Sequence, residues 1–133
     1  MRADLNSNTV RALAITAAVA IAVQLLFFDE PAFAVRIVAA TWDKLVHFTV
    51  FGGIAFLLWV GTGARWPVLV WALVALLGAL DEAHQVYVPG RTADIEDFFA
   101  DAIGAACALL VLQALSFATP HLCSTRVASM NGG

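Results

Sequence analysis

Four long stretches of the chain contain no Asp, Glu, Lys or Arg. They cover residues 12–28, 45–64, 66–80 and 102–125. A transmembrane helix needs about 20 mostly apolar residues, so the third stretch must continue past Asp81 to span a membrane. Strict alternation of apolar and polar residues, the pattern of a membrane β-barrel strand, is absent. The pattern therefore predicts an all-α integral membrane four-helix bundle. Its helices are expected at residues 9–28, 43–62, 67–87 and 95–117.

The connections between these helices carry their own signals. Residues 31–40 are predicted to form a short interfacial helix after the first span, because Pro31 suits a first helical turn. Residues 88–91 (Val-Pro-Gly-Arg) are typical of a tight type II turn. A single transmembrane domain is expected at residues 1–118, followed by a tail at 119–133.

Composition supports the membrane assignment. The 133 residues are 62% hydrophobic and 13% charged, and the mean hydropathy is +0.87. Soluble domains carry about 25% charged residues, and a fold of this size leaves much of its chain facing water. A lone soluble domain is therefore excluded. The net charge of −3 also argues against a nucleic-acid partner, which requires a basic face.

The distribution of Lys and Arg favours an orientation with both termini on the cytoplasmic side. The basic residues on that side are Arg2, Arg11, Arg65 and Arg126, against Arg36, Lys44 and Arg91 on the other. One alternative is a cleaved signal peptide in residues 1–34, because Ala32-Phe33-Ala34 resembles a cleavage site. Cleavage would leave three spans.

Small and aromatic residues suggest how the helices pack. Small residues allow close approach of membrane helices, and tryptophan is typical of membrane interfaces. The expected close contacts involve Gly52, Gly53, Gly78 and Gly104, and the expected interface anchors are Trp42, Trp59, Trp66 and Trp71.

More than half of the 17 charged residues are predicted to lie at one membrane face, where the second and fourth helices begin and the third ends. Charges at membrane depth are costly, so they usually face the bundle interior and pair. Helical spacing places Asp43 with His47, and Asp97 with Asp101, on shared helix faces. The expected polar layer consists of Asp43, Lys44, His47, Asp81, Glu82, His84, Gln85, Arg91, Asp94, Glu96, Asp97 and Asp101.

Structural roles account for many of the same residues. Asp94, Glu96 and Asp97 suit the N-terminus of a helix, where they cap it and oppose its dipole. Lys44 is able to snorkel to the membrane interface. The whole layer would also serve as a salt-bridge network that fixes helix register.

Three motifs in this layer resemble those of the VanZ-like family. They are Asp43-Lys44-x-x-His47-Phe48-x-x-Phe51, Gly78-x-x-Asp81-Glu82-x-His84-Gln85-x-x-x-Pro89-Gly90-Arg91 and Asp94-x-x-Asp97-x-x-x-Asp101-x-x-Gly104-Ala105. The resemblance covers residues 41–115, although the family often carries Asn where this chain has Asp101. It implies a small multi-span protein of the bacterial inner membrane, with a connection to resistance against the glycopeptide teicoplanin. It implies no particular reaction.

The first functional hypothesis is a binding protein for a lipid head group or a lipid-linked cell-wall precursor. Lys44 and Arg91 would contact a phosphate, while nearby carboxylates would orient these cations or bind sugar hydroxyls. The expected binding residues are Asp43, Lys44, His47, Asp81, Glu82, His84, Gln85, Arg91, Asp94, Asp97 and Asp101.

The second hypothesis is a metal-assisted enzyme that acts on a lipid phosphate. A divalent metal, the only cofactor that the residues suggest, would be held by Asp81, Glu82, Asp97 and Asp101. The catalytic candidates are His47, Glu82 and Asp97. A third hypothesis, a small proton-coupled transporter, is weaker because only Gln24 and Gln113 offer a polar path towards the opposite face.

Overall fold

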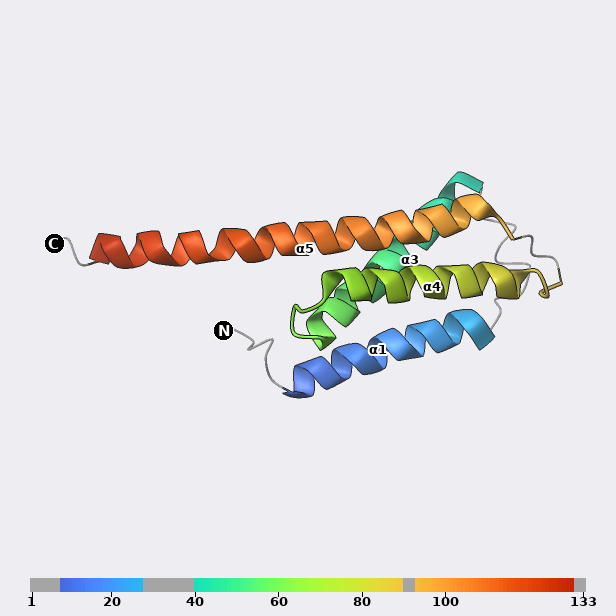
Figure 1. Ribbon diagram of the computed structural model, residues 1–133, viewed down its shortest axis with the longest axis horizontal. Coiled ribbons are helices and arrows are strands. Elements are labelled where there is room, and N and C mark those ends of the chain that lie inside the picture. Colours follow the sequence, from blue (N-terminus) through green and yellow to red (C-terminus); the bar gives the residue numbers. More distant parts are fainter. Residues whose placement is uncertain (1–7, 28–39, 90–92, 131–133) are drawn as a thin grey trace.

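The computed structural model describes residues 8–27, 40–89 and 93–130, and four helices make up most of this part of the chain (Figure 1). They are α1 (Asn8–Phe27), α3 (Ala40–Gly61), α4 (Pro67–Gln85) and α5 (Ile95–Met130). Each is long and apolar enough to cross a membrane, and the described residues include no strand. The predicted all-α four-span fold is confirmed. The interfacial helix expected at residues 31–40 lies almost entirely outside the described residues.

The C-terminal helix differs from the prediction. The sequence suggested an end at residue 117, but α5 continues through Pro120 to Met130. Proline removes the backbone N–H that would bond the carbonyl of Ser116, and the helix continues on its remaining hydrogen bonds. Figure 1 shows the C-terminal part of α5 extending well beyond the other helices.

The helices alternate in direction, and α3 packs against α1, α4 and α5. Figure 1 shows the start of α1, the α3–α4 connection and the C-terminal part of α5 towards one end of the bundle. The start of α3, the end of α4 and the start of α5 lie towards the other end. Segments far apart in the sequence therefore meet at this second end, as the charge pattern predicted.

A small apolar core surrounds α3, and glycine allows the closest contact in it. Phe51, Ile54 and Ala55 of α3 are almost fully buried, together with residues of the other three helices. A Cβ atom on Gly104 of α5 would overlap the carbonyl oxygen of Phe48 in α3. The two backbones therefore touch, in agreement with the small-residue pattern. The close contact expected at Gly53 was wrong, because a Cβ atom there would meet no atom within 4 Å.

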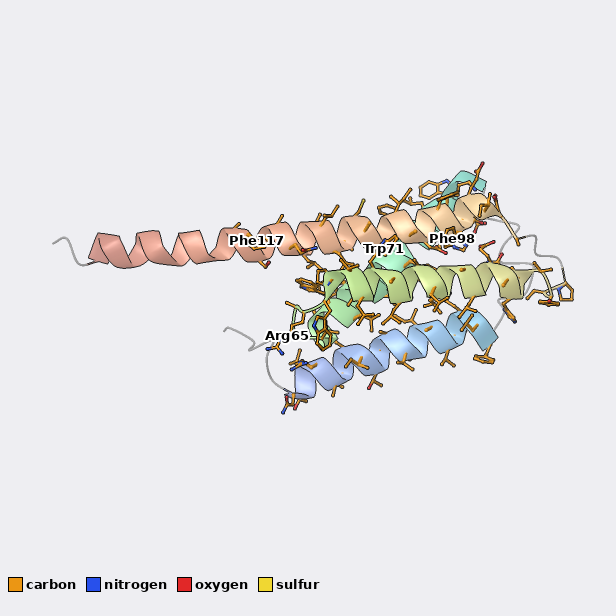
Figure 2. All side chains as sticks on the ribbon, viewed as in Figure 1. Arg65, Trp71, Phe98 and Phe117 are labelled. Carbon is orange, nitrogen blue, oxygen red and sulfur yellow. The ribbon has the colours of Figure 1, made fainter. Side chains whose placement is uncertain are left out.

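The four tryptophans do not share one role. Trp42 and Trp66 are more than 60% exposed, as expected for interface anchors. Trp59 is instead part of the buried core, so its prediction as an anchor was wrong. Trp59 lies near the end of α3, where an interface position was expected, but its side of the helix packs against neighbouring helices. The Trp71 indole, labelled in Figure 2, donates a hydrogen bond of 3.0 Å to the Ala102 carbonyl oxygen.

Candidate functional site

Polar side chains from three helices meet at the end of the bundle where α3 and α5 begin and α4 ends. Six of them are buried, and all six belong to the residues predicted from the sequence. We call the following residues the polar cluster: Asp43, Lys44, His47, Asp81, Glu82, Gln85, Asp94, Glu96, Asp97 and Asp101. The buried members are His47, Asp81, Glu82, Gln85, Asp97 and Asp101.

Lys44 connects the start of α3 to the start of α5. Its Nζ atom lies 3.1 Å from Asp94 Oδ2, 3.0 Å from Glu96 Oε2 and 3.2 Å from Asp97 Oδ1. Asp94 also caps α5, because its Oδ1 accepts a 2.9 Å hydrogen bond from the Glu96 N–H. This N–H and the Lys44 ammonium lower the pKa of Asp94. Lys44 is thus already paired with three carboxylates, and its expected contact with a phosphate stays a prediction.

His47 is held by the most deeply buried carboxylate of the cluster. Its Nδ1 atom lies 3.0 Å from Oδ1 of Asp101, which is fully buried. The imidazole stacks on Phe51 with ring centroids 6.2 Å apart. Because a carboxylate only accepts hydrogen bonds, this contact places the proton on Nδ1 and leaves the Nε2 lone pair for another partner. Oδ2 of Asp97 lies 4.0 Å from that nitrogen.

Gly78 makes room for this buried acid. A Cβ atom at position 78 would lie 2.7 Å from Asp101 Oδ2, closer than side chains tolerate. Oδ2 itself is buried and has no hydrogen-bond partner among the described residues. The glycine of the second sequence motif and the last aspartate of the third therefore fit together across α4 and α5.

The end of α4 carries two acids with defined partners. Gln85 donates a 3.0 Å hydrogen bond to Asp81 Oδ2, and the Asp94 N–H donates one of 2.7 Å to Glu82 Oε2. Oε1 of Glu82 is buried without a hydrogen-bond partner in the part of the chain that the structure describes, and so is Nδ1 of His84. Glu82 thus has one oxygen fixed by a neighbouring backbone and the other available for a ligand.

Two groups in the cluster have the geometry to hold a metal ion. One consists of Asp43, His47 and Asp97, and the other of His47, Asp81 and Glu82. In each group, one ligand atom per residue lies within 4.8 Å of the others. The sequence suggested a set that included Asp101. In the structure this aspartate instead binds Nδ1 of His47.

A groove between α4 and α5 reaches the cluster, and the sequence analysis missed it. Its volume is about 420 Å³. It is lined by Ala79, Glu82, Ala83, Val86, Ala93, Ile95 and Phe98, of which Phe98 is labelled in Figure 2. The α4 residues follow the i, i+3, i+4, i+7 spacing of one helix face, which is the signal that would have indicated it. Glu82 is the one ionisable residue in its lining.

Arg91 lies outside the described residues, together with Gly90 and Thr92. Its predicted contact with a phosphate stays a prediction. Among the described residues of the cluster, Lys44 is therefore the one side chain with a permanent positive charge.

The fold and the cluster define a class: a membrane protein of four spanning helices with a buried polar site at one end of the bundle. Comparison with known families identifies it further. The VanZ/LLP1 family model matches residues 5–116, which is most of the chain, and the chain belongs to this family. The resemblance found in the three motifs is thereby confirmed. No curated protein and no solved structure compared with the chain matches it.

Proposed function

We propose that the protein binds a membrane lipid, with the lipid head group at the polar cluster and the adjoining chain in the α4–α5 groove. One observation carries this proposal. The carboxylate of Glu82 lies in the wall of an otherwise apolar groove and also belongs to the buried cluster. In a membrane-spanning bundle such a groove faces hydrocarbon, while its polar wall offers a place for a head group.

The charges of the cluster restrict the head group. The polar cluster contains seven carboxylates, and Lys44 is already paired with three of them. Carboxylates accept hydrogen bonds from hydroxyls, so sugar or glycerol hydroxyls suit them directly. A phosphate would need an additional positive charge, supplied by Arg91 or by a bound cation.

The groove provides the test. We expect Ala83→Trp to lower the affinity for a polyprenyl phosphate by about tenfold or more, which corresponds to about 1.4 kcal/mol. The indole would fill the space beside Glu82 that the lipid chain requires. Native mass spectrometry of the purified protein would measure the bound fraction against lipid concentration. Phosphatidylglycerol would be titrated in parallel to separate the two phosphate-bearing lipid classes.

Ala72→Trp is the matched control, because Ala72 is an exposed residue of α4 outside the groove. It should bind both lipids like the unaltered protein. Equal binding by the Ala83 and Ala72 variants would contradict a site in the groove.

A second function, chemistry on a lipid phosphate, is favoured by the clustered imidazole and carboxylates around His47. Metal-assisted phosphoryl transfer uses such ligands to hold a cation that neutralises the phosphate oxygens. Release of inorganic phosphate from the bound lipid, dependent on added Mn²⁺, would distinguish this function from binding alone.

We also propose that the protein lies in the bacterial inner membrane with both termini in the cytoplasm, and that it affects susceptibility to teicoplanin. Family membership and the balance of basic residues support these assignments.

Cysteine labelling tests the proposed orientation. In intact cells, a membrane-impermeant maleimide should label Pro89→Cys in a chain lacking both native cysteines. It should not label native Cys123 in a Cys107→Ala chain, because the end of α4 and the C-terminal part of α5 lie at opposite ends of the bundle (Figure 1). Labelling of both from outside would contradict the four-span topology, and the reverse pattern would invert the orientation.

A further inference from the structure

We propose that His47, Asp81 and Glu82 together bind one divalent metal ion in the polar cluster. The three ligands come from α3 and the last turns of α4, and all three side chains are buried. The ion would provide the positive charge that a phosphate head group requires. Its role in lipid recognition therefore rests on the proposed function, whereas its binding to the protein does not.

Each of the three side chains has a hydrogen-bond contact that orients it. Asp101 holds Nδ1 of His47 at 3.0 Å. Gln85 holds Oδ2 of Asp81 at 3.0 Å. The backbone N–H at position 94 holds Oε2 of Glu82 at 2.7 Å. Outer-shell contacts of this kind fix the rotamer and tautomer of metal ligands, and their energetic importance is well established.

An unpartnered atom points independently to a ligand. Glu82 is 9% exposed, and its Oε1 atom has no hydrogen-bond partner among the described residues. A buried carboxylate oxygen without a partner is unfavourable. Glu82 offers a carboxylate oxygen within 4.8 Å of a ligand atom from His47 and one from Asp81. A cation bound between these three side chains would give the Glu82 carboxylate the partner that its Oε1 atom lacks.

The competing group of Asp43, His47 and Asp97 is less suitable for a cation. Lys44 Nζ lies 3.2 Å from Asp97 Oδ1, so a second positive charge there would be repelled. Asp43 is also only partly buried. Both groups need His47, and its Nε2 lone pair can serve only one ion at a time. The charges therefore favour the group on the α4 side.

The ligand types indicate which ions fit. Two carboxylates and one imidazole suit Mn²⁺ or Zn²⁺ better than Ca²⁺, which prefers a shell made entirely of oxygen. Three protein ligands leave coordination positions for water or for an oxygen of the bound head group. Glu82, one of the three proposed ligands, also lies in the wall of the α4–α5 groove.

Mn²⁺ binding to the full chain in detergent micelles tests the inference. We expect one ion per chain by equilibrium dialysis. Electron spin-echo spectroscopy of the unaltered protein should show one coordinated imidazole nitrogen. Glu82→Gln and Asp81→Asn should each weaken Mn²⁺ binding by about 100-fold. Loss of an outer-shell partner costs up to about this much, and a direct ligand should matter at least as much. Glu96→Gln is the matched control, because this exposed acid contacts Lys44 outside the proposed ligand set.

The outcomes separate the two metal groups and the two proposals. Loss of Mn²⁺ binding in Asp43→Asn with retention in Glu82→Gln would overturn the assignment. The lack of an imidazole signal in the unaltered protein would also overturn the assignment. This measurement does not depend on whether a variant folds. Mn²⁺ binding without lipid binding would support the metal site and contradict the proposed function. Lipid binding by a protein that binds no Mn²⁺ would overturn the metal site alone.

Discussion

Replacing Gly104 with alanine is expected to destabilise the bundle by about 1–3 kcal/mol, the usual cost of forcing extra atoms into a tightly packed contact. The added methyl group would overlap the carbonyl oxygen of Phe48. A backbone atom has no alternative rotamer, so α3 and α5 would have to move apart. Asp101 lies one helical turn before Gly104 and contacts His47 in α3, so the same movement would disturb the polar cluster.

Unfolding in mixed micelles with increasing SDS, followed by far-ultraviolet circular dichroism, would measure this loss. Gly53→Ala is the control, because a Cβ atom there meets no atom within 4 Å. It is expected to leave stability unchanged or to raise it by up to about 1 kcal/mol through better helix propensity. Equal stability of the two variants would show that α3 and α5 do not touch at Gly104.

Replacing Asp101 with leucine should be even more disruptive for the site. It would leave Nδ1–H of His47 buried without an acceptor, at a cost of about 1–3 kcal/mol. The branched leucine side chain would also press against Gly78. The two positions are packed so closely that a Cβ atom on Gly78 would lie only 2.7 Å from the present Asp101 Oδ2. If His47 binds a metal, losing this outer-shell partner should weaken Mn²⁺ binding by about 10–100-fold.

Asp101→Asn is the informative counterpart. Asparagine keeps a carbonyl oxygen for Nδ1–H and has nearly the same shape, so we expect stability close to that of the unaltered chain. Micelle unfolding and Mn²⁺ dialysis on the leucine and asparagine variants would show whether Asp101 acts as the hydrogen-bond acceptor of His47. Unaltered Mn²⁺ affinity in the leucine variant would show that Asp101 does not position His47 for metal binding.

Much of the architecture follows from the sequence because lipid imposes simple rules. Apolar runs of sufficient length give the four spans, and Pro67 marks the first residue of α4 in the structure. Helical spacing also placed several polar side chains on shared faces. Asp97 and Asp101 lie on one face of α5, as their four-residue spacing suggested, and both approach His47.

The partners within the cluster were not predictable in the same way. They depend on how α3 packs against α5, and that contact is set by the touching backbones at Phe48 and Gly104. Spacing along one helix contains no information about this packing. Three features therefore become visible only once the helices are packed together. They are the pairing of Lys44 with three acids, the contact of Asp101 with His47 and the groove beside Glu82.

The side-chain contacts between the start of α3 and the start of α5 have a consequence for biosynthesis. Lys44 and His47 are made and delivered to the membrane early, but their partners Asp94, Asp97 and Asp101 follow at least 50 residues later in the chain. Until α5 arrives, the nascent protein carries a cation and an imidazole at the membrane without their carboxylates. Insertion of α5 supplies the carboxylate partners of both side chains, so the polar cluster is complete only after the last helix has entered the membrane.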